Sequence, residues 1–158
     1  QFDNTRSEMG ELVYQLKYRS DKSAVDKIVA LLDAIRGIEK FDCLIPVPAT
    51  NKNRPVKPVD LITEALGKRR GVAVAFGALT NSGNEELKGI TDPVARNELL
   101  VAAIGLESPE RFTGKKVLLV DDLYRSGSTL RVATNLLYEA GGAAQVSVLT
   151  MTKTRSNR

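Results

Sequence analysis

The chain has 158 residues, 42% hydrophobic and 27% charged, which predicts a single soluble globular domain over 1–158 and excludes a disordered chain. It has no histidine and one cysteine, which excludes serine-histidine-aspartate and cysteine-histidine catalysis and an internal disulfide, and argues against a zinc site. The net charge of +4 favours an anionic partner, either a phosphorylated small molecule or a nucleic acid.

Apolar periodicity predicts helices that alternate with short strands. The predicted helices are residues 23–37, a helix that begins at Pro58 and ends at the basic run 68–71, and residues 128–142. The predicted strands are residues 43–47, 71–76, 116–120 and 145–151. Ser23 and Asp26 are the expected cap of the first helix, and Gly141 and Gly142 are expected to close the last. This alternation predicts an α/β fold with a parallel sheet flanked by helices.

The segment between residues 80 and 111 differs in pattern from the rest of the chain. The periodic pattern weakens between residues 80 and 111, where asparagine, glycine and proline are frequent. A long irregular segment in a compact domain is either a flexible lid with its connecting segment or a surface loop without a role, and composition does not separate the two.

No apolar run approaches the roughly 18 residues of a membrane helix, so we expect no membrane partner and a cytoplasmic location.

The stretch VLLVDDLYRSGSTL, residues 117–130, carries the most chemical information. Asp121 and Asp122 follow an apolar strand, and in parallel sheets ligands bind outside the carboxyl ends of the strands. The serine-rich turn after them opens a helix, whose unpaired amides favour a phosphate. The two carboxylates suit vicinal hydroxyls or a cation. A sugar phosphate satisfies both halves of the stretch.

Three other interpretations of this stretch are weaker. The acidic pair also fits the second motif of a phosphate-loop NTPase, but no GK[ST] sequence occurs in the chain. It fits the first strand of a receiver domain, yet too little chain follows Asp122. A plain helix cap explains Ser126 but leaves two adjacent acids at a strand end unexplained.

The stretch resembles the phosphoribosyl pyrophosphate motif of type I phosphoribosyltransferases, in which an apolar run, two acids, a short variable segment and a Ser/Thr-Gly-x-Thr turn follow one another. The resemblance implies that the acids hold the ribose hydroxyls and that the loop after them grips the 5′-phosphate. The implied ligand-binding residues are Asp121, Asp122, Leu123, Tyr124, Arg125, Ser126, Gly127, Ser128 and Thr129. The fold that it implies adds a small N-terminal hood, residues 1–22, and the flexible lid within 80–111.

Weaker similarities favour the ComF-like, competence-protein branch of this family. LVYQLKYRSDK (12–22) resembles its hood, and LIPVPAT (44–50) resembles the strand before its pyrophosphate loop. The implied pyrophosphate loop is Ala49, Thr50, Asn51, Lys52, Asn53 and Arg54. The chain departs from the branch at RPVKP (54–58), where an Arg-Gly-Phe-Asn-Gln segment is usual. The cysteine-rich zinc element that often precedes the domain does not occur within these 158 residues, and a sequence that begins at Gln1 leaves open whether such an element precedes them.

The resemblance implies an enzyme of nucleotide metabolism, a pentosyl-group glycosyltransferase that moves phosphoribosyl from phosphoribosyl pyrophosphate to a base-like nitrogenous acceptor. Asp121 and Asp122 would stabilise the positive ring of the transition state and hold Mg²⁺, chiefly through water. Lys88 and Arg96 on the lid would neutralise the leaving pyrophosphate, although a solvated surface role is the common one for each alone. Arg125 stands where purine-salvage relatives place an acid, and because arginine stays protonated it disfavours base catalysis there.

A second function hypothesis is a non-catalytic module that senses phosphoribosyl pyrophosphate or a nucleotide and acts with DNA, RNA or a protein in DNA uptake or regulation. The basic run 68–71 favours it slightly, although such runs usually mark a solvated helix end. Families of this kind are frequently homodimers. Tyr18 and Arg19 could contact an acceptor, but a core tyrosine beside a surface arginine is the simpler interpretation, and Cys43 is expected to be an inert, buried thiol.

Overall fold

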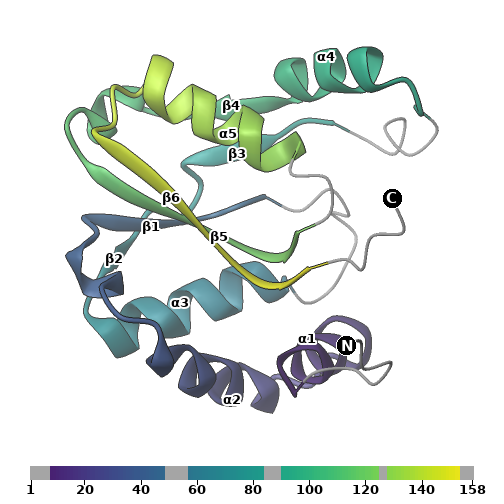
Figure 1. The fold of residues 1–158 in the computed structure, drawn as a ribbon, viewed down its shortest axis with the longest axis vertical. Helices are drawn as coiled ribbons and strands as arrows, with labels where there is room; N and C mark the ends of the chain where they lie inside the picture. The colour runs from purple at the N-terminus through teal and green to yellow at the C-terminus, as the bar shows by residue number, and fades with distance from the viewer. Residues whose placement is uncertain (1–7, 49–56, 84–89, 125–127, 154–158) are drawn as a thin grey trace, which may run out of the picture.

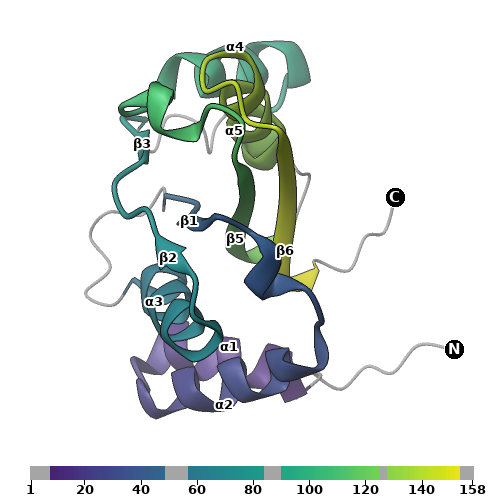
Figure 2. The same ribbon diagram turned by 90° about the vertical axis from the view of Figure 1, so that its left-hand side faces the viewer.

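The computed structural model describes residues 8–48, 57–83, 90–124 and 128–153, and these form a parallel sheet between two helical layers (Figure 1; Figure 2). Within these residues the sheet has four strands in the order β2-β1-β5-β6, and each neighbouring pair is parallel. The strands are β1 (Cys43–Pro46), β2 (Ala73–Val74), β5 (Lys116–Tyr124) and β6 (Gln145–Lys153). The predicted α/β fold with a parallel sheet flanked by helices is confirmed.

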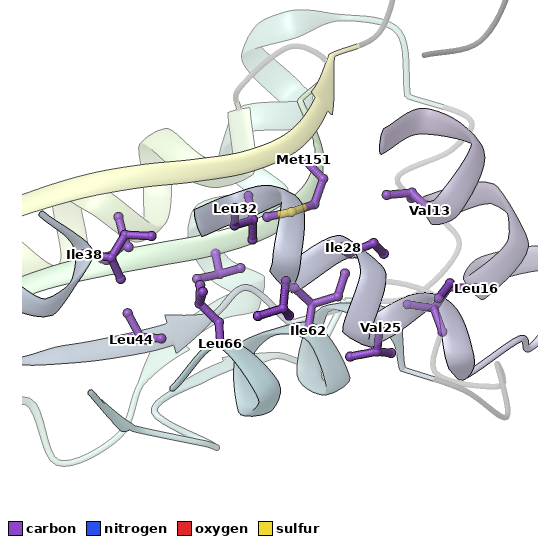
Figure 3. Close-up of a cluster of buried hydrophobic side chains, with 14 of the residues drawn as sticks. Val13, Leu16, Val25, Ile28, Leu32, Ile38, Leu44, Ile62, Leu66 and Met151 are labelled. Atoms are coloured by element: carbon purple, nitrogen blue, oxygen red, sulfur yellow. The ribbon is translucent and has the colours of Figure 1, made fainter. Parts of the chain in front are cut away.

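Three helices cover one face of the sheet: α1 (Glu8–Arg19), α2 (Ser23–Leu31) and α3 (Pro58–Arg70). Their apolar faces meet the sheet in a cluster of buried side chains (Figure 3). Leu16, Ile28 and Ile62 bring one side chain from each helix into this cluster. The cluster continues into β1 through Leu44 and into β6 through Met151. The segment predicted as the hood therefore packs on the main core through α1.

The opposite side of the sheet carries α4 (Pro93–Ala103), α5 (Ser128–Glu139) and a small antiparallel pair, β3 (Leu79–Asn81) with β4 (Ile104–Leu106). A second buried cluster joins α5 to the sheet through Leu137, Val117 and Leu119. Short 3-10 helices complete the described chain: η1 (Leu32–Ala34), η2 (Ile38–Lys40) and η4 (Pro109–Phe112). The sheet is thus buried on both faces, as its continuous apolar strands predict.

Strand β5 divides its side chains between these two layers. Val117 and Leu119 belong to the cluster beneath α5, whereas Leu118 and Val120 belong to the cluster beneath α1, α2 and α3. This division follows from the period of two residues along a β-strand. The same alternation sets the directions in which the side chains of Asp121 and Asp122 leave β5.

The first predicted helix is shorter than its apolar pattern indicates. α2 ends at Leu31, tightens into η1, and leaves Ile35 38% exposed instead of buried. Arg70 of α3 donates hydrogen bonds to the carbonyl oxygens of Leu32 and Ile35, at 3.2 Å and 2.7 Å, and so satisfies acceptors at this end. The predicted capping pair is also wrong, because Asp21 Oδ1 accepts from the backbone N–H and the hydroxyl of Ser23, at 3.1 Å and 2.6 Å.

The third helix of this layer matches its predicted boundaries. Pro58 occupies the first turn of α3, and Gly71 ends the helix with a φ of +72°, a conformation that suits glycine. Inside the helix, a Cβ atom on Gly67 would lie 2.8 Å from the carbonyl oxygen of Val72 and 2.6 Å from a methyl of Val74. Glycine at this position therefore lets α3 pass close to β2.

The segment 80–111 is more regular than its composition indicates. Its described residues include most of β3, all of α4 and β4, and part of η4, so the prediction of an irregular excursion is wrong for them. α4 begins conventionally: Asp92 accepts a hydrogen bond from the N–H of Ala95 at 3.1 Å, and Pro93 takes the first helical position. The predicted lid role is not tested by this geometry.

Candidate functional site

The candidate site lies where the order of the parallel strands reverses. From β1 the chain passes through α3 to β2 on one side, and from β5 it passes through α5 to β6 on the other. α3 and α5 lie on opposite faces of the sheet (Figure 1), so the direction of the chain connections reverses between the carboxyl ends of β1 and β5. This is the position at which open α/β sheets bind ligands, and the predicted acidic pair lies on one of its two strands.

Asp121 and Asp122 lie inside β5, not beyond its end as predicted. β5 continues to Tyr124 because β6 stays paired with it as far as Tyr124 and Lys153. β1, in contrast, ends at Pro46, and its last contact with β5 is the hydrogen bond from Val47 N–H to the Val120 carbonyl at 2.9 Å. The two acids are therefore the first residues of β5 to extend past β1.

Strand alternation directs the side chains of Asp121 and Asp122 away from opposite sides of β5. Asp121 continues the series of Val117 and Leu119, on the side of α5. Asp122 continues the series of Leu118 and Val120, on the side of α1. The two carboxyl groups nevertheless lie close together, because both the charge of Asp122 and a hydrogen bond with its side chain act on the pKa of Asp121.

The Asp121 carboxyl group is half-buried and is poorly suited to carry a charge. Burial, and secondly the negative charge of Asp122, raise its pKa to about 7. Its Oδ1 accepts a hydrogen bond from the backbone N–H of Asp122 at 2.8 Å, and this bond opposes the rise. Carboxyl groups with a raised pKa of this kind cluster at functional sites.

Asp122 is held by two contacts. Its Oδ2 lies 3.2 Å from the Nζ of Lys17 in α1, and the two side chains are only 13% and 15% exposed. Its carbonyl oxygen accepts a hydrogen bond from the hydroxyl of Thr152 in β6 at 3.2 Å. The carboxylate of Asp122 thus has a fixed position and a nearby counter-charge.

The phosphate-binding half of the predicted site is described in part. Ser128 and Thr129 form the first turn of α5, which begins on the side of the sheet where β5 ends (Figure 1). Arg131 donates a hydrogen bond from Nη2 to Ser128 Oγ at 3.4 Å, so a cation also lies at this helix start. Leu123 and Tyr124 belong to β5 through their backbones. Arg125, Ser126 and Gly127 lie outside the described residues.

The other predicted site residues are only partly within the described chain. The pyrophosphate loop, Ala49, Thr50, Asn51, Lys52, Asn53 and Arg54, lies outside it, as does Lys88. Arg96 lies in the first turn of α4, and its action on a leaving pyrophosphate stays a prediction. Cys43 is half-buried, and burial raises the pKa of its thiol, which agrees with an inert side chain.

Sequence reasoning missed Lys17 and Thr152. Lys17 follows the buried Leu16 and lies one helical turn after the buried Val13. Its position at the edge of the apolar face of α1 could therefore have been predicted from the sequence. Its pairing with Asp122 had no local signal, since the two residues meet only through the tertiary fold. Tyr18 was expected in the core, yet its side chain is 60% exposed, because it lies on the outer face of the same helix.

The described residues contain no cluster of three or more acidic, histidine or cysteine side chains that could hold a metal ion alone. Mg²⁺ is usually held by one or two carboxylates together with substrate phosphates. Asp121 and Asp122 fit that mode of binding. Within the described chain no helix is long and apolar enough to cross a membrane.

Comparison with known proteins establishes the fold. No protein-family model and no curated protein matches the sequence. Among solved structures, adenine phosphoribosyltransferase from Thermoanaerobacter pseudethanolicus aligns with a TM-score of 0.55 and 18% identity, over 86% of this chain and 84% of that enzyme. Hypoxanthine phosphoribosyltransferase from Staphylococcus aureus aligns with a TM-score of 0.54 and 16% identity, over 87% of this chain and 67% of that enzyme.

Adenine phosphoribosyltransferase from Saccharomyces cerevisiae, solved with adenine and D-2,5-dideoxy-2,5-imino-altritol 1,6-bisphosphate, aligns with a TM-score of 0.53 and 14% identity, over 86% of this chain and 73% of that enzyme. These structural neighbours are type I phosphoribosyltransferases. The chain therefore has the type I phosphoribosyltransferase fold. The narrower resemblance to the ComF-like branch stays a prediction.

Proposed function

We propose that the protein binds phosphoribosyl pyrophosphate together with Mg²⁺ and transfers the phosphoribosyl group to a nitrogenous acceptor, with release of pyrophosphate. The observation that carries this proposal is the position of Asp121 and Asp122, which extend past β1 at the reversal of strand order and precede the start of α5. In this arrangement the ribose hydroxyls donate hydrogen bonds to the acids. The first turn of α5, with Ser128 and Thr129, binds the 5′-phosphate.

In the proposed reaction the bond between ribose C1 and the pyrophosphate oxygen breaks, and a bond between C1 and the acceptor nitrogen forms. The ring gains positive charge in the transition state, and the Asp122 carboxylate, fixed by Lys17, stabilises that charge. The acceptor releases its proton to solvent, because Arg125 is not a base. Mg²⁺, held through water near the two acids, would supply charge neutralisation on the pyrophosphate.

The hood helix supports a planar acceptor. The exposed Tyr18 ring has its centroid 5.9 Å from the Lys17 Nζ atom, and that same atom contacts Asp122, so the ring lies close to the sugar site. The Tyr14 ring lies 5.1 Å from the Tyr18 ring, and the Arg19 guanidinium lies 6.0 Å from the Tyr14 ring. Such a group of aromatic and cationic side chains favours a flat acceptor with an acidic substituent.

The basic run 68–71 gives less support to a nucleic-acid partner than its sequence indicated. Arg69 forms a two-bond ion pair with Asp33. Arg70 is 10% exposed and is engaged with Glu39 and two carbonyl oxygens. Lys68 Nζ lies 3.8 Å from Glu64 Oε2, so all three cations of the run have partners within the described chain. The non-catalytic sensing module remains the competing outcome of the experiment below.

The experiment is calorimetric titration with phosphoribosyl pyrophosphate and Mg²⁺, followed by measurement of pyrophosphate release with a panel of acceptors. The panel should pair each heterocyclic base with a carboxylated analogue. We expect micromolar binding by the unmodified protein, turnover with acidic acceptors, and loss of binding in Asp122→Asn. The control is Asp26→Asn, which removes the same charge from the exposed face of α2 and should leave binding unchanged. Binding without turnover would identify the sensing module. Absence of binding by the unmodified protein would refute the proposal.

A further inference from the structure

One contact of the candidate site joins segments that are far apart in the sequence. Lys17 is on α1, in the hood, and Asp122 is on β5, in the centre of the sheet, yet Nζ and Oδ2 are 3.2 Å apart. Both side chains are largely shielded from water, with 15% and 13% exposure. An ion pair in such surroundings is a specific contact and not one of the loose pairs common on protein surfaces.

The contact is supported on both sides. Val13 and Leu16 anchor α1 in the core next to Lys17, and Leu118 and Val120 anchor β5 next to Asp122 (Figure 3 labels Val13 and Leu16). The hydroxyl of Thr152 in β6 also donates a hydrogen bond to the Asp122 carbonyl oxygen, which fixes the main chain at Asp122. The hood therefore cannot leave the sheet without separating the ammonium from the carboxylate.

Partly buried ion pairs contribute little net stability, because both charges lose solvation when they are formed. Their better attested role is to select one arrangement of the groups around them. For Asp122 the selected arrangement directs Oδ2 to Lys17 and so fixes the orientation of the carboxylate that would meet a ligand hydroxyl. The Lys17 charge also offsets the repulsion between the carboxylate and an anionic ligand.

We propose that Lys17 is a positioning residue that orients Asp122 for sugar binding and thereby couples docking of the hood to occupancy of the sugar-phosphate site. This inference rests on the proposed function, since it assigns the ligand of Asp122. Coupling of this kind is reciprocal. If a docked hood favours the ligand, the bound ligand must favour the docked hood to the same degree.

The first test measures the affinity for phosphoribosyl pyrophosphate with Mg²⁺ by calorimetry in matched variants. Lys17→Met keeps the length of the side chain without its charge, and we expect affinity to fall about tenfold, within the usual range of coupling between sites. Lys17→Arg keeps the charge and should stay within about threefold of the unmodified protein. Lys27→Met, on the exposed face of α2, should bind as the unmodified protein does.

The second test measures the docking of the hood directly. Hydrogen exchange of the amides in α1 should slow when phosphoribosyl pyrophosphate and Mg²⁺ are added, and this slowing should be absent in Lys17→Met. Full affinity in Lys17→Met, an equal loss in Lys27→Met, or unchanged exchange in α1 on ligand binding would each overturn the role of Lys17 while leaving the proposed function intact. No binding by the unmodified protein would overturn both.

Discussion

Replacing Asp121 with asparagine should make the protein more stable above neutral pH, although it removes a residue of the candidate site. The substitution keeps the shape of the side chain and an oxygen that can accept the hydrogen bond from Asp122 N–H. It removes the carboxyl group whose pKa burial and the charge of Asp122 raise from 3.8 to about 7. Because the folded-state pKa is raised, the stability linked to this group is complete below about pH 4 and is lost as the pH rises through about 7.

The size of the effect follows from that difference in pKa. Roughly three pKa units, at about 1.4 kcal/mol for each, give an upper value of about 4 kcal/mol for ionising Asp121 in the folded protein. We expect Asp121→Asn to raise the free energy of unfolding by about 2–4 kcal/mol at pH 8, and by less than about 1 kcal/mol near pH 4.

Urea unfolding at a series of pH values measures this difference directly, provided that the m-value is the same in both proteins. The control is Asp26→Asn, which lies on an exposed surface and should give a small difference that does not vary with pH. If Asp121→Asn is no more stable than the unmodified protein at pH 8, or if its advantage is the same at every pH, the Asp121 carboxyl group is not destabilised by its surroundings and the reasoning is refuted.

Three further predictions test how the fold supports the site. Gly67→Ala should lower the free energy of unfolding by about 1–3 kcal/mol in urea titrations, because the added Cβ would collide with the Val72 carbonyl oxygen. This loss is expected although alanine favours helices more than glycine does. A free energy of unfolding equal to or above that of the unmodified protein would contradict the close approach of α3 to β2. Arg70→Ala should lower it by about 1–3 kcal/mol, since two carbonyl oxygens lose their donor, whereas Lys68→Ala on the same helix should change it by less than about 0.5 kcal/mol. Asp92→Ala should accelerate amide exchange in the first turn of α4 by removing its cap, with little change in α5; uniform acceleration would point to global destabilisation instead.

The sheet and its helices could be predicted because their signals are local. Residues 117–120 form a continuous apolar run between polar segments, and such a run is typical of a strand buried on both faces. The start and end of α3 have a proline and a glycine whose backbone preferences fix them. The acidic pair was also recognisable, because two adjacent acids at the end of such a strand have no structural explanation.

The geometry within the site could not be predicted in the same way. Whether β5 continued through Asp121 and Asp122 depended on pairing with β6, a strand whose length is set by its partner. That continuation places both acids in the part of β5 that extends past β1. The pairing of Lys17 with Asp122 depends on how α1 docks against the sheet, which no pattern within residues 8–19 encodes.

The two acids affect the fold differently, and this difference bears on why they are present. A valine at position 121 would extend the buried series of Val117 and Leu119, whereas the observed carboxyl group destabilises the folded protein above neutral pH. Asp122 requires a lysine from another segment to offset its charge. Residues that oppose stability at positions where apolar side chains would pack are expected where a ligand uses them. We therefore expect that phosphoribosyl pyrophosphate with Mg²⁺ raises the melting temperature of the unmodified protein but not that of the more stable Asp121→Asn variant. An equal rise in both proteins would show that Asp121 is not part of the binding site.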